Sequence, residues 1–221
     1  MAEIVFLFDV DNTLLDNDRI RADMSAQLTA AYGVATHDRY WMIFERLRSE
    51  LGYADYLGAL ERCRLEDMHN PNLLDMALWL IDYPFADRLY PGALEAVRHA
   101  SRLGQTVILS DGDAVFQPLK VARSGLGRAF EGRRLIYIHK EQELAEVERQ
   151  RPARHYVVID DKLRILAAIK KIWRDRVTTV YVKQGHYAHD DAALAGLPAA
   201  DVEIAAIADF VNCAFPSPAC A

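Results

Sequence analysis

Acidic residues stand directly behind two apolar segments of this 221-residue sequence. Asp9 and Asp11 follow the run IVFLF, and Asp160 and Asp161 follow the run YVVI. Carboxylates held close together repel one another unless a cation neutralises them, and Mg²⁺ prefers hard oxygen ligands of this kind. The pattern therefore predicts a magnesium site, provided that the two segments lie side by side.

A hydroxyl and an ammonium group stand behind two further apolar segments. Ser110 follows the run TVIL, with Asp111 and Gly112 next to it, and Lys140 follows the run LIYI after one histidine. A carboxylate nucleophile, a divalent metal, a hydroxyl donor and a lysine are the groups that phosphoryl transfer through an aspartyl-phosphate requires. The sequence thus contains a complete set for that chemistry.

Five short apolar runs predict the strands that position these groups, because they are β-branched and nearly continuous in apolarity, as in a buried parallel sheet. The runs are Ile4–Phe8, Thr106–Leu109, Leu135–Ile138, Tyr156–Ile159 and Val177–Val182. Helical stretches at 91–104, 114–127 and 163–173 alternate with them, which is typical of an α/β fold. VEIAAIADF predicts an edge strand and a terminal helix. Ligands bind at the carboxyl ends of such strands, so the polar groups would meet in one cleft.

One long segment interrupts this alternation. Residues 17–87 contain no convincing strand and show the spacing of about four amphipathic helices. We therefore predict a three-layer Rossmann-like α/β core made of residues 1–16 and 88–221, with an all-helical insertion at 17–87.

The composition excludes several classes of function. With 26 basic and 32 acidic residues the net charge is −6, so no basic field exists for nucleic acid. No apolar run is long enough for a membrane span, and Cys63, Cys213 and Cys220 are too few and too scattered for a disulfide framework or a zinc site. We expect a soluble cytoplasmic protein, monomeric or homodimeric, without nucleic-acid or membrane partners.

The order of these motifs resembles the haloacid dehalogenase-like superfamily of phosphotransferases. FDVDNTLL resembles its first motif, VILSDGD its second, Lys140 its third and VVIDDK its fourth. The helical insertion between the first two motifs resembles the C1-type cap of that superfamily. The resemblance covers nearly the whole chain and implies a magnesium-dependent phosphatase that acts on a small phosphorylated metabolite.

The same resemblance implies catalytic roles. Asp9 would attack the phosphorus and carry the phosphoryl group, while Asp11 would act as general acid and then as general base. Electrostatic stabilisation would come from groups that hold the phosphoryl oxygens. The phosphate-binding residues would be Ser110, Asp111, Gly112 and Lys140.

The metal ligands follow from the resemblance in the same way. Mg²⁺ would bind the Asp9 carboxylate, the backbone carbonyl of Asp11 and an acid of the fourth motif. Both Asp160 and Asp161 are candidates, and the sequence does not choose between them. Thr13 would fix the loop rather than touch substrate.

Two positions depart from the superfamily pattern. Asp111 stands where a neutral residue is common, and its negative charge would repel phosphate unless it points away, is protonated or meets a cation. Glu141 follows Lys140 where proline is common. Neither change removes a catalytic group.

Other polar residues have simpler interpretations. Substrate selectivity would reside in the insertion, but the default role of its polar residues is core packing or a place on a helix surface. The default role of the polar residues after the fifth strand is a surface or capping role. The residues concerned are His37, Arg46, Tyr53 and Tyr56 in the insertion, and His186 and His189 after the strand.

Several alternatives stay open. A 2-haloacid dehalogenase uses the same aspartate without a metal, although Asp11 and the acidic pair would then be unnecessary. A phosphosugar mutase would return the phosphoryl group to its substrate. A receiver-like signalling module is about half this length. A catalytically weakened protein that binds a phosphorylated ligand is the last alternative, motivated by Asp111.

Overall fold

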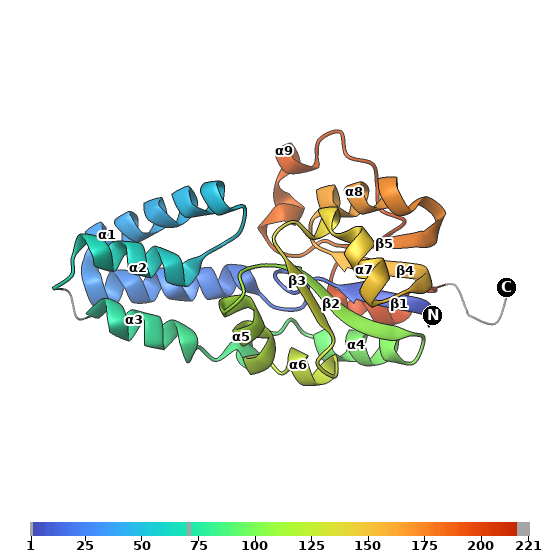
Figure 1. Cartoon of the computed structure of the whole chain (residues 1–221), viewed down its shortest axis with the longest axis horizontal. Coiled ribbons are helices and arrows are strands. Elements are labelled where there is room, and N and C mark those ends of the chain that lie inside the picture. The colour runs from blue at the N-terminus through green and yellow to red at the C-terminus, as the bar shows by residue number, and fades with distance from the viewer. Residues whose placement is uncertain (1, 70–71, 216–221) are drawn as a thin grey trace.

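A computed structural model describes residues 2–69 and 72–215, so Cys220 lies outside the described part. Six parallel strands form one sheet in the order β3-β2-β1-β4-β5-β6, which lies in the right-hand half of Figure 1. The strands are β1 (Ala2–Phe8), β2 (Gln105–Asp111), β3 (Arg134–Tyr137), β4 (Ala153–Asp160), β5 (Val177–Val182) and β6 (Val202–Ile204). The predicted Rossmann-like α/β fold is confirmed.

Both faces of the sheet are buried, which explains the nearly continuous apolar runs. Val5 and Leu7 of β1 face one hydrophobic core, and Phe6 and Phe8 face the other. The first core also takes residues of α7 (Leu144–Gln150) and α8 (Leu163–Trp173). The second takes residues of α4 (Ala93–Ser101), α5 (Phe116–Arg123), α6 (Leu126–Ala129) and the 3₁₀ turn η5 (Ile207–Asn212). Helices therefore cover both sides, giving three layers.

The segment between β1 and α4 is helical, as predicted. It contains α1 (Asn17–Leu51), α2 (Tyr56–Glu66), α3 (Asn72–Ile81) and the 3₁₀ turn η1 (Phe85–Arg88). Gly33 has φ 79° and ψ 169° and divides α1 into two arms, drawn blue and cyan at the left of Figure 1. A hydrogen bond between Ser25 and His37 and one that Trp41 donates to Ser25 join the two arms. We call α1–α3 the cap. Its separation from the core as a domain stays a prediction.

Some predicted elements differ from the observed ones. The helical stretch predicted at 114–127 is divided into α5 and α6 at Ser124 and Gly125. Ile138 lies outside β3 and is 46% exposed, since the strand ends at Tyr137. The predicted terminal helix is the 3₁₀ turn η5. The remaining short elements are η2 (Lys140–Gln142), η3 (Arg174–Arg176), η4 (His186–His189) and α9 (Asp191–Leu194).

The strand register brings the chemical groups to one edge of the sheet. Phe8 of β1 is paired with Ile108 of β2 and with Ile159 of β4. Because β1 lies between these two strands, Asp9, Ser110 and Asp160 follow at the same carboxyl edge. The chain adds β2 and β3 on one side of β1 and then β4, β5 and β6 on the other side. Open α/β sheets bind ligands at such a switch point in strand order.

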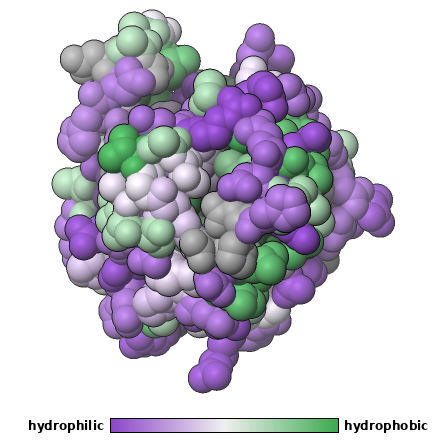
Figure 2. All heavy atoms as spheres, turned by 90° about the vertical axis from the view of Figure 1, so that its left-hand side faces the viewer, coloured by the Kyte–Doolittle hydropathy of each residue, from purple (hydrophilic) through white to green (hydrophobic). Residues whose placement is uncertain are grey.

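Hydrophilic residues dominate the cap end of the molecule, and the apolar areas between them are interrupted rather than continuous (Figure 2). Among the described residues, no helix has both the length and the apolarity needed to cross a bilayer.

Candidate active site

Three buried carboxylates meet at the carboxyl ends of β1 and β4. Asp9, Asp160 and Asp161 each place one oxygen within 4.8 Å of the other two, and none of them is more than 3% exposed. The ammonium of Lys140, itself 1% exposed, lies 2.5 Å from Asp9 Oδ1 and 2.6 Å from Asp160 Oδ2. One buried lysine therefore bridges two of the three acids.

Burial and the neighbouring charges both shift the pKa values of the groups in this cluster. Burial disfavours the charged form of Lys140, but the carboxylates of Asp160 and Asp9 outweigh it and hold the pKa of Lys140 above its ordinary value. Burial also raises the pKa of Asp160, although Lys140 opposes this. These two carboxylates therefore favour the charged form of Lys140.

The surroundings of the Asp161 carboxylate indicate whether a metal ion fits this acidic cluster. Neither of its carboxylate oxygens has a hydrogen-bond partner among the described residues, and the side chain is fully buried. Burial raises the pKa of Asp161 well above its ordinary value. A buried carboxylate without donors is stable only when it is protonated or bound to a cation. Three carboxylate oxygens within 4.8 Å also match the oxygen chemistry of Mg²⁺, so these residues fit the ion.

This geometry also separates the two acids of the fourth motif. Asp160 is engaged by Lys140 and accepts a hydrogen bond at Oδ1 from the backbone N–H of Lys162 at 2.8 Å. Asp161 keeps both oxygens available. Of the two, Asp161 is therefore better suited to bind a metal directly.

The hydroxyl groups near Asp9 hold its carboxylate. Thr13 Oγ1 donates to Asp9 Oδ2 at 3.3 Å, and Ser110 Oγ lies 3.5 Å from Asp9 Oδ1. Gln117 Nε2 donates to Ser110 Oγ at 2.9 Å and so orients that hydroxyl. Thr13 thus contacts the proposed nucleophile itself rather than only the loop.

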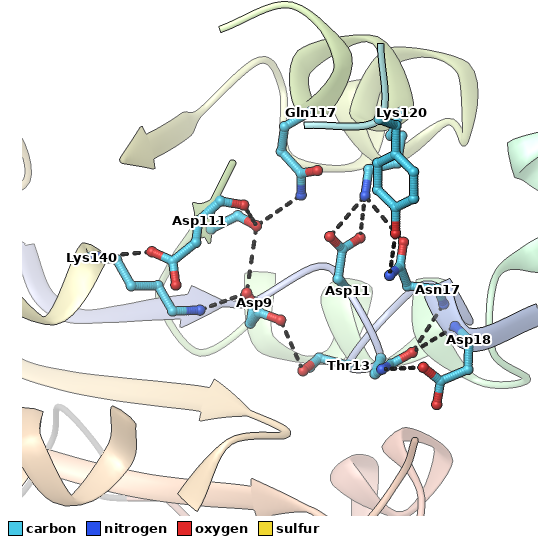
Figure 3. A network of polar contacts seen from close by, with 12 residues as sticks. Asp9, Asp11, Thr13, Asn17, Asp18, Asp111, Gln117, Lys120 and Lys140 are labelled. Atoms are coloured by element: carbon cyan, nitrogen blue, oxygen red, sulfur yellow. Dashed lines mark hydrogen bonds and ion pairs between the residues drawn. The ribbon is translucent and has the colours of Figure 1, made fainter. Parts of the chain in front are cut away.

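Asp11 turns toward a different lysine from Asp9 (Figure 3). Lys120 Nζ, on α5, lies 2.6 and 2.7 Å from the two carboxylate oxygens of Asp11. It also donates to Asn17 Oδ1 at 3.3 Å, where the cap begins. Lys120 is 1% exposed, whereas the Asp11 side chain is 25% exposed. The accessible member of the pair is therefore the acid.

The carboxylate of Asp111, which departs from the superfamily pattern, is held by a backbone hydrogen bond. Its Oδ1 accepts a hydrogen bond from the backbone N–H of Lys140 at 2.8 Å. Burial raises the pKa of Asp111, and Lys140 opposes this. The N–H of Gly112 donates to the carbonyl oxygen of Tyr137 at 2.9 Å, so this N–H is already engaged. The phosphate-binding roles of Asp111 and Gly112 stay predictions.

A cavity of about 290 Å³ lies between the cap and the carboxyl edge of the sheet. Of the predicted site residues, Asp11, Asp111 and Gly112 line it, and the lining does not include Asp9, Ser110, Lys140, Asp160 or Asp161. Six other polar residues were given packing, surface or capping roles by default in the sequence analysis. Of these, Tyr53, Tyr56 and His186 line the cavity, whereas His37, Arg46 and His189 do not. The cap residues that line it are Asn17, Arg21, Arg48, Gly52, Tyr53, Ala54 and Tyr56.

The sequence analysis missed several residues of this region. They are Gln117, Lys120, Arg48, Lys162 and Tyr187. A signal existed for two of them, because Gln117 and Lys120 are polar residues on the apolar face of their helix, beside Phe116 and Val121. Polar groups on a buried face require partners. Arg48 and Tyr187 carried no such signal, since only tertiary folding brings them together.

Comparisons with known proteins agree with this architecture. The model of the family described as haloacid dehalogenase-like hydrolases matches residues 5–173. A solved haloacid dehalogenase-like hydrolase from Burkholderia xenovorans is 60% identical, with 95% of each chain covered and a TM-score of 0.90. Among the curated proteins compared, none matches this chain.

More distant structures share the fold. An L-2-haloacid dehalogenase from Xanthobacter autotrophicus has a TM-score of 0.63 at 18% identity, covering 94% of this chain and 96% of the other. A HAD-hydrolase from Bacillus subtilis, solved with bound magnesium, has a TM-score of 0.61 at 15% identity, covering 95% and 97%. At such identities the likeness shows the fold alone.

Proposed function

Because the chain belongs to the haloacid dehalogenase-like hydrolases, we propose that it is a magnesium-dependent phosphatase of small phosphomonoesters, with Asp9 as nucleophile. One observation carries the choice of chemistry. The buried carboxylate of Asp161 lies beside Asp9 and Asp160 and has no hydrogen-bond partner among the described residues, and a divalent cation would compensate that cluster.

The residues of this chain would act in two steps. A carboxylate oxygen of Asp9 bonds to phosphorus, and the ester oxygen leaves with the electrons of its P–O bond and takes a proton from the Asp11–Lys120 pair. Water then attacks the same phosphorus, gives its proton to Asp11, and releases inorganic phosphate and free Asp9. Lys140 and Ser110 would contact the phosphoryl oxygens. When bound by Asp9 and Asp161, Mg²⁺ would supply positive charge against those oxygens.

A second candidate is a 2-haloacid dehalogenase, in which Asp9 would displace halide from carbon. Two distant structural neighbours, at 18% and 15% identity, are L-2-haloacid dehalogenases, so this fold accommodates that chemistry. The Lys120 ion pair also gives Asp11 a structural role that needs no acid–base catalysis. In this reading Asp161 would be protonated and no metal would be required.

Phosphate and halide release distinguish the two candidates. The purified protein is assayed with p-nitrophenyl phosphate and a panel of phosphorylated metabolites, in Mg²⁺ and in EDTA, and with both enantiomers of 2-chloropropionate. Asp9→Asn is the nucleophile control. We expect phosphate release that EDTA and Asp9→Asn each reduce at least a hundredfold, and no halide release.

Other outcomes reassign the chemistry. Halide release that persists in EDTA and requires Asp9 would replace the phosphatase by a dehalogenase. Return of the phosphoryl group to a second position of the substrate would identify a mutase. A folded, metal-binding protein that is silent in every assay would point to a ligand-binding role.

A further inference from the structure

Cationic side chains outnumber acidic ones around the cavity between cap and core. The cavity is lined by Arg21, Arg48, Lys120, Lys162 and Arg164, and by Asp11, Asp111 and Glu141. A cleft with such an excess attracts anions. The cations of this cavity differ in how closely a carboxylate of the protein pairs with them.

Four of the five lie within 4 Å of a carboxylate. Lys120 is paired with Asp11. Arg164 lies 3.6 Å from Glu141, and Arg21 lies 3.2 Å from Glu45 on the other arm of α1.

The fourth of these cations is Arg48, whose carboxylate partner Glu45 is 3.6 Å away, half exposed and shared with Arg21. The ammonium of Lys162 has no hydrogen bond or ion pair to any described residue. Both side chains line the cavity.

Tyr187 brings these two cations to one place. Arg48 Nη2, from the cap, donates to the Tyr187 hydroxyl at 2.7 Å. The ammonium of Lys162, from the core, lies 5.2 Å from the centroid of the Tyr187 ring. The ring itself packs against His186, which is bound to Asp18 of α1. The guanidinium of Arg48 keeps further N–H groups, whose fork geometry suits a carboxylate.

We propose that Arg48 and Lys162 form a second anion subsite, which binds a carboxylate of the substrate at a distance from the reacting phosphate. The inference rests on the proposed phosphatase activity and names its substrate class, the phosphate ester of a short-chain hydroxy acid. The cavity volume of about 290 Å³ is at the small end for ligand sites and agrees with a compact substrate. Asp9, Ser110 and Lys140 would engage the phosphate end, and Arg48 and Lys162 the carboxylate end.

Matched substrates test the subsite. Phosphoglycolate carries a carboxylate where 2-hydroxyethyl phosphate carries an alcohol, and ethylene glycol bisphosphate carries a second phosphate. We expect the wild type to prefer phosphoglycolate over the alcohol at least tenfold in kcat/KM, and to accept the bisphosphate less well. Arg48→Gln and Lys162→Met should each lower that preference at least tenfold, and Arg48→Lys should restore part of it.

Arg46→Gln is the matched control, because Arg46 lies on the same helix, is 57% exposed and lies 3.9 Å from Glu50. It should keep the wild-type preference. An unchanged preference in both Arg48→Gln and Lys162→Met, or none in the wild type, would overturn the carboxylate subsite. Preference for the bisphosphate would assign the subsite to a phosphate instead.

A binding measurement distinguishes an error in the proposed subsite from an error in the proposed activity. If neither p-nitrophenyl phosphate nor any phosphorylated metabolite of the panel is hydrolysed, the phosphatase assignment fails by itself. Calorimetric titration with phosphoglycolate still tests the subsite, since it requires no turnover. Affinity should fall at least tenfold in Arg48→Gln and stay unchanged in Arg46→Gln, and equal affinity in the wild type and Arg48→Gln would overturn the proposal.

Discussion

Lys120 Nζ contacts both carboxylate oxygens of Asp11, at 2.6 and 2.7 Å. The lysine is buried and the acid is partly exposed to the cavity. A buried cation is stable only when it keeps a partner, so this pair fixes the direction of Asp11. Asp9, two residues earlier, is held by a different lysine, Lys140. Two acids that are only two residues apart in the first motif thereby have separate electrostatic surroundings.

Removal of Lys120 should lower turnover without removing any group of the acidic cluster. Lys120→Met leaves Asp11 without its ion pair, and misplacement of an acid–base group typically costs about 10²-fold in rate. Lys120→Arg keeps the charge and should recover most of the activity. Steady-state kcat and its pH profile are measured for both variants, with the exposed Lys171→Met as control. Equal kcat and an unchanged pH profile in wild type and Lys120→Met would show that Asp11 needs no such partner.

Much of the core could be predicted from the sequence, because its determinants are local. The buried strands are apolar on both faces, and their ends carry the motif residues, so β1, β2, β4 and β5 and the helix α8 were predicted close to their actual bounds. The predicted meeting of Asp9, Ser110, Lys140 and the acidic pair follows from parallel pairing alone.

Other features depend on tertiary contacts that no local pattern encodes. The pairing of Lys120 with Asp11 joins residues 109 positions apart, and that of Arg48 with Tyr187 joins residues 139 apart. The reversal of α1 at Gly33 lies within an otherwise continuous helical pattern. The partner of Asp111 is a backbone N–H, which carries no sequence signature.

Loss of the Asp161 charge should remove most of the stabilisation by magnesium. A ligand at a hundred times its Kd stabilises a folded protein by about 2.7 kcal/mol, and Mg²⁺ should raise the melting temperature of the wild type accordingly. Asp161→Asn should reduce that shift by more than half. It should also melt at a higher temperature than the wild type in EDTA, because an uncompensated buried carboxyl group is gone.

Thermal melting in EDTA and in Mg²⁺ measures both effects. Asp175→Asn, an exposed acid in η3, is the control and should behave as the wild type. A full magnesium shift in Asp161→Asn would remove this residue from the metal site.

Asp111 should tolerate asparagine but not leucine. Asparagine keeps a side-chain oxygen that can accept the N–H of Lys140, now 2.8 Å from Asp111 Oδ1. Leucine leaves that N–H without a partner, at a cost of about 1 to 3 kcal/mol, and frees the segment that carries Lys140. We expect Asp111→Asn to keep kcat within about threefold, with Asp111→Leu at least tenfold lower. If asparagine is as damaging as leucine, the charge itself is required.

Asp23 should make the stability of the cap sensitive to acid. It lies on the first arm of α1, accepts a hydrogen bond from the Tyr83 hydroxyl, and pairs with Arg88 Nη2 at 2.8 Å. Burial raises the pKa of Asp23, but the hydrogen bonds from Tyr83 and Arg88 outweigh it and hold the pKa below its ordinary value. A carboxyl group with a lowered pKa in the folded state stabilises the protein above its unfolded pKa, about 3.9. That stabilisation is lost as the pH falls through the lowered folded pKa.

Asp23→Asn should therefore cost about 1 kcal/mol of unfolding free energy at pH 7, since the group is mostly but not fully buried. The difference from the wild type should shrink as the pH falls below about 4, because the wild-type carboxyl group then also loses its charge. Urea unfolding between pH 3 and pH 7 measures it, with Asp87→Asn, an exposed acid one residue before Arg88, as control. A difference that stays constant over this range would mean that Asp23 acts through its hydrogen bonds and shape. A difference that grows with acidity would contradict the lowered pKa, because only a group that binds its proton more tightly when folded gains stability as the pH falls.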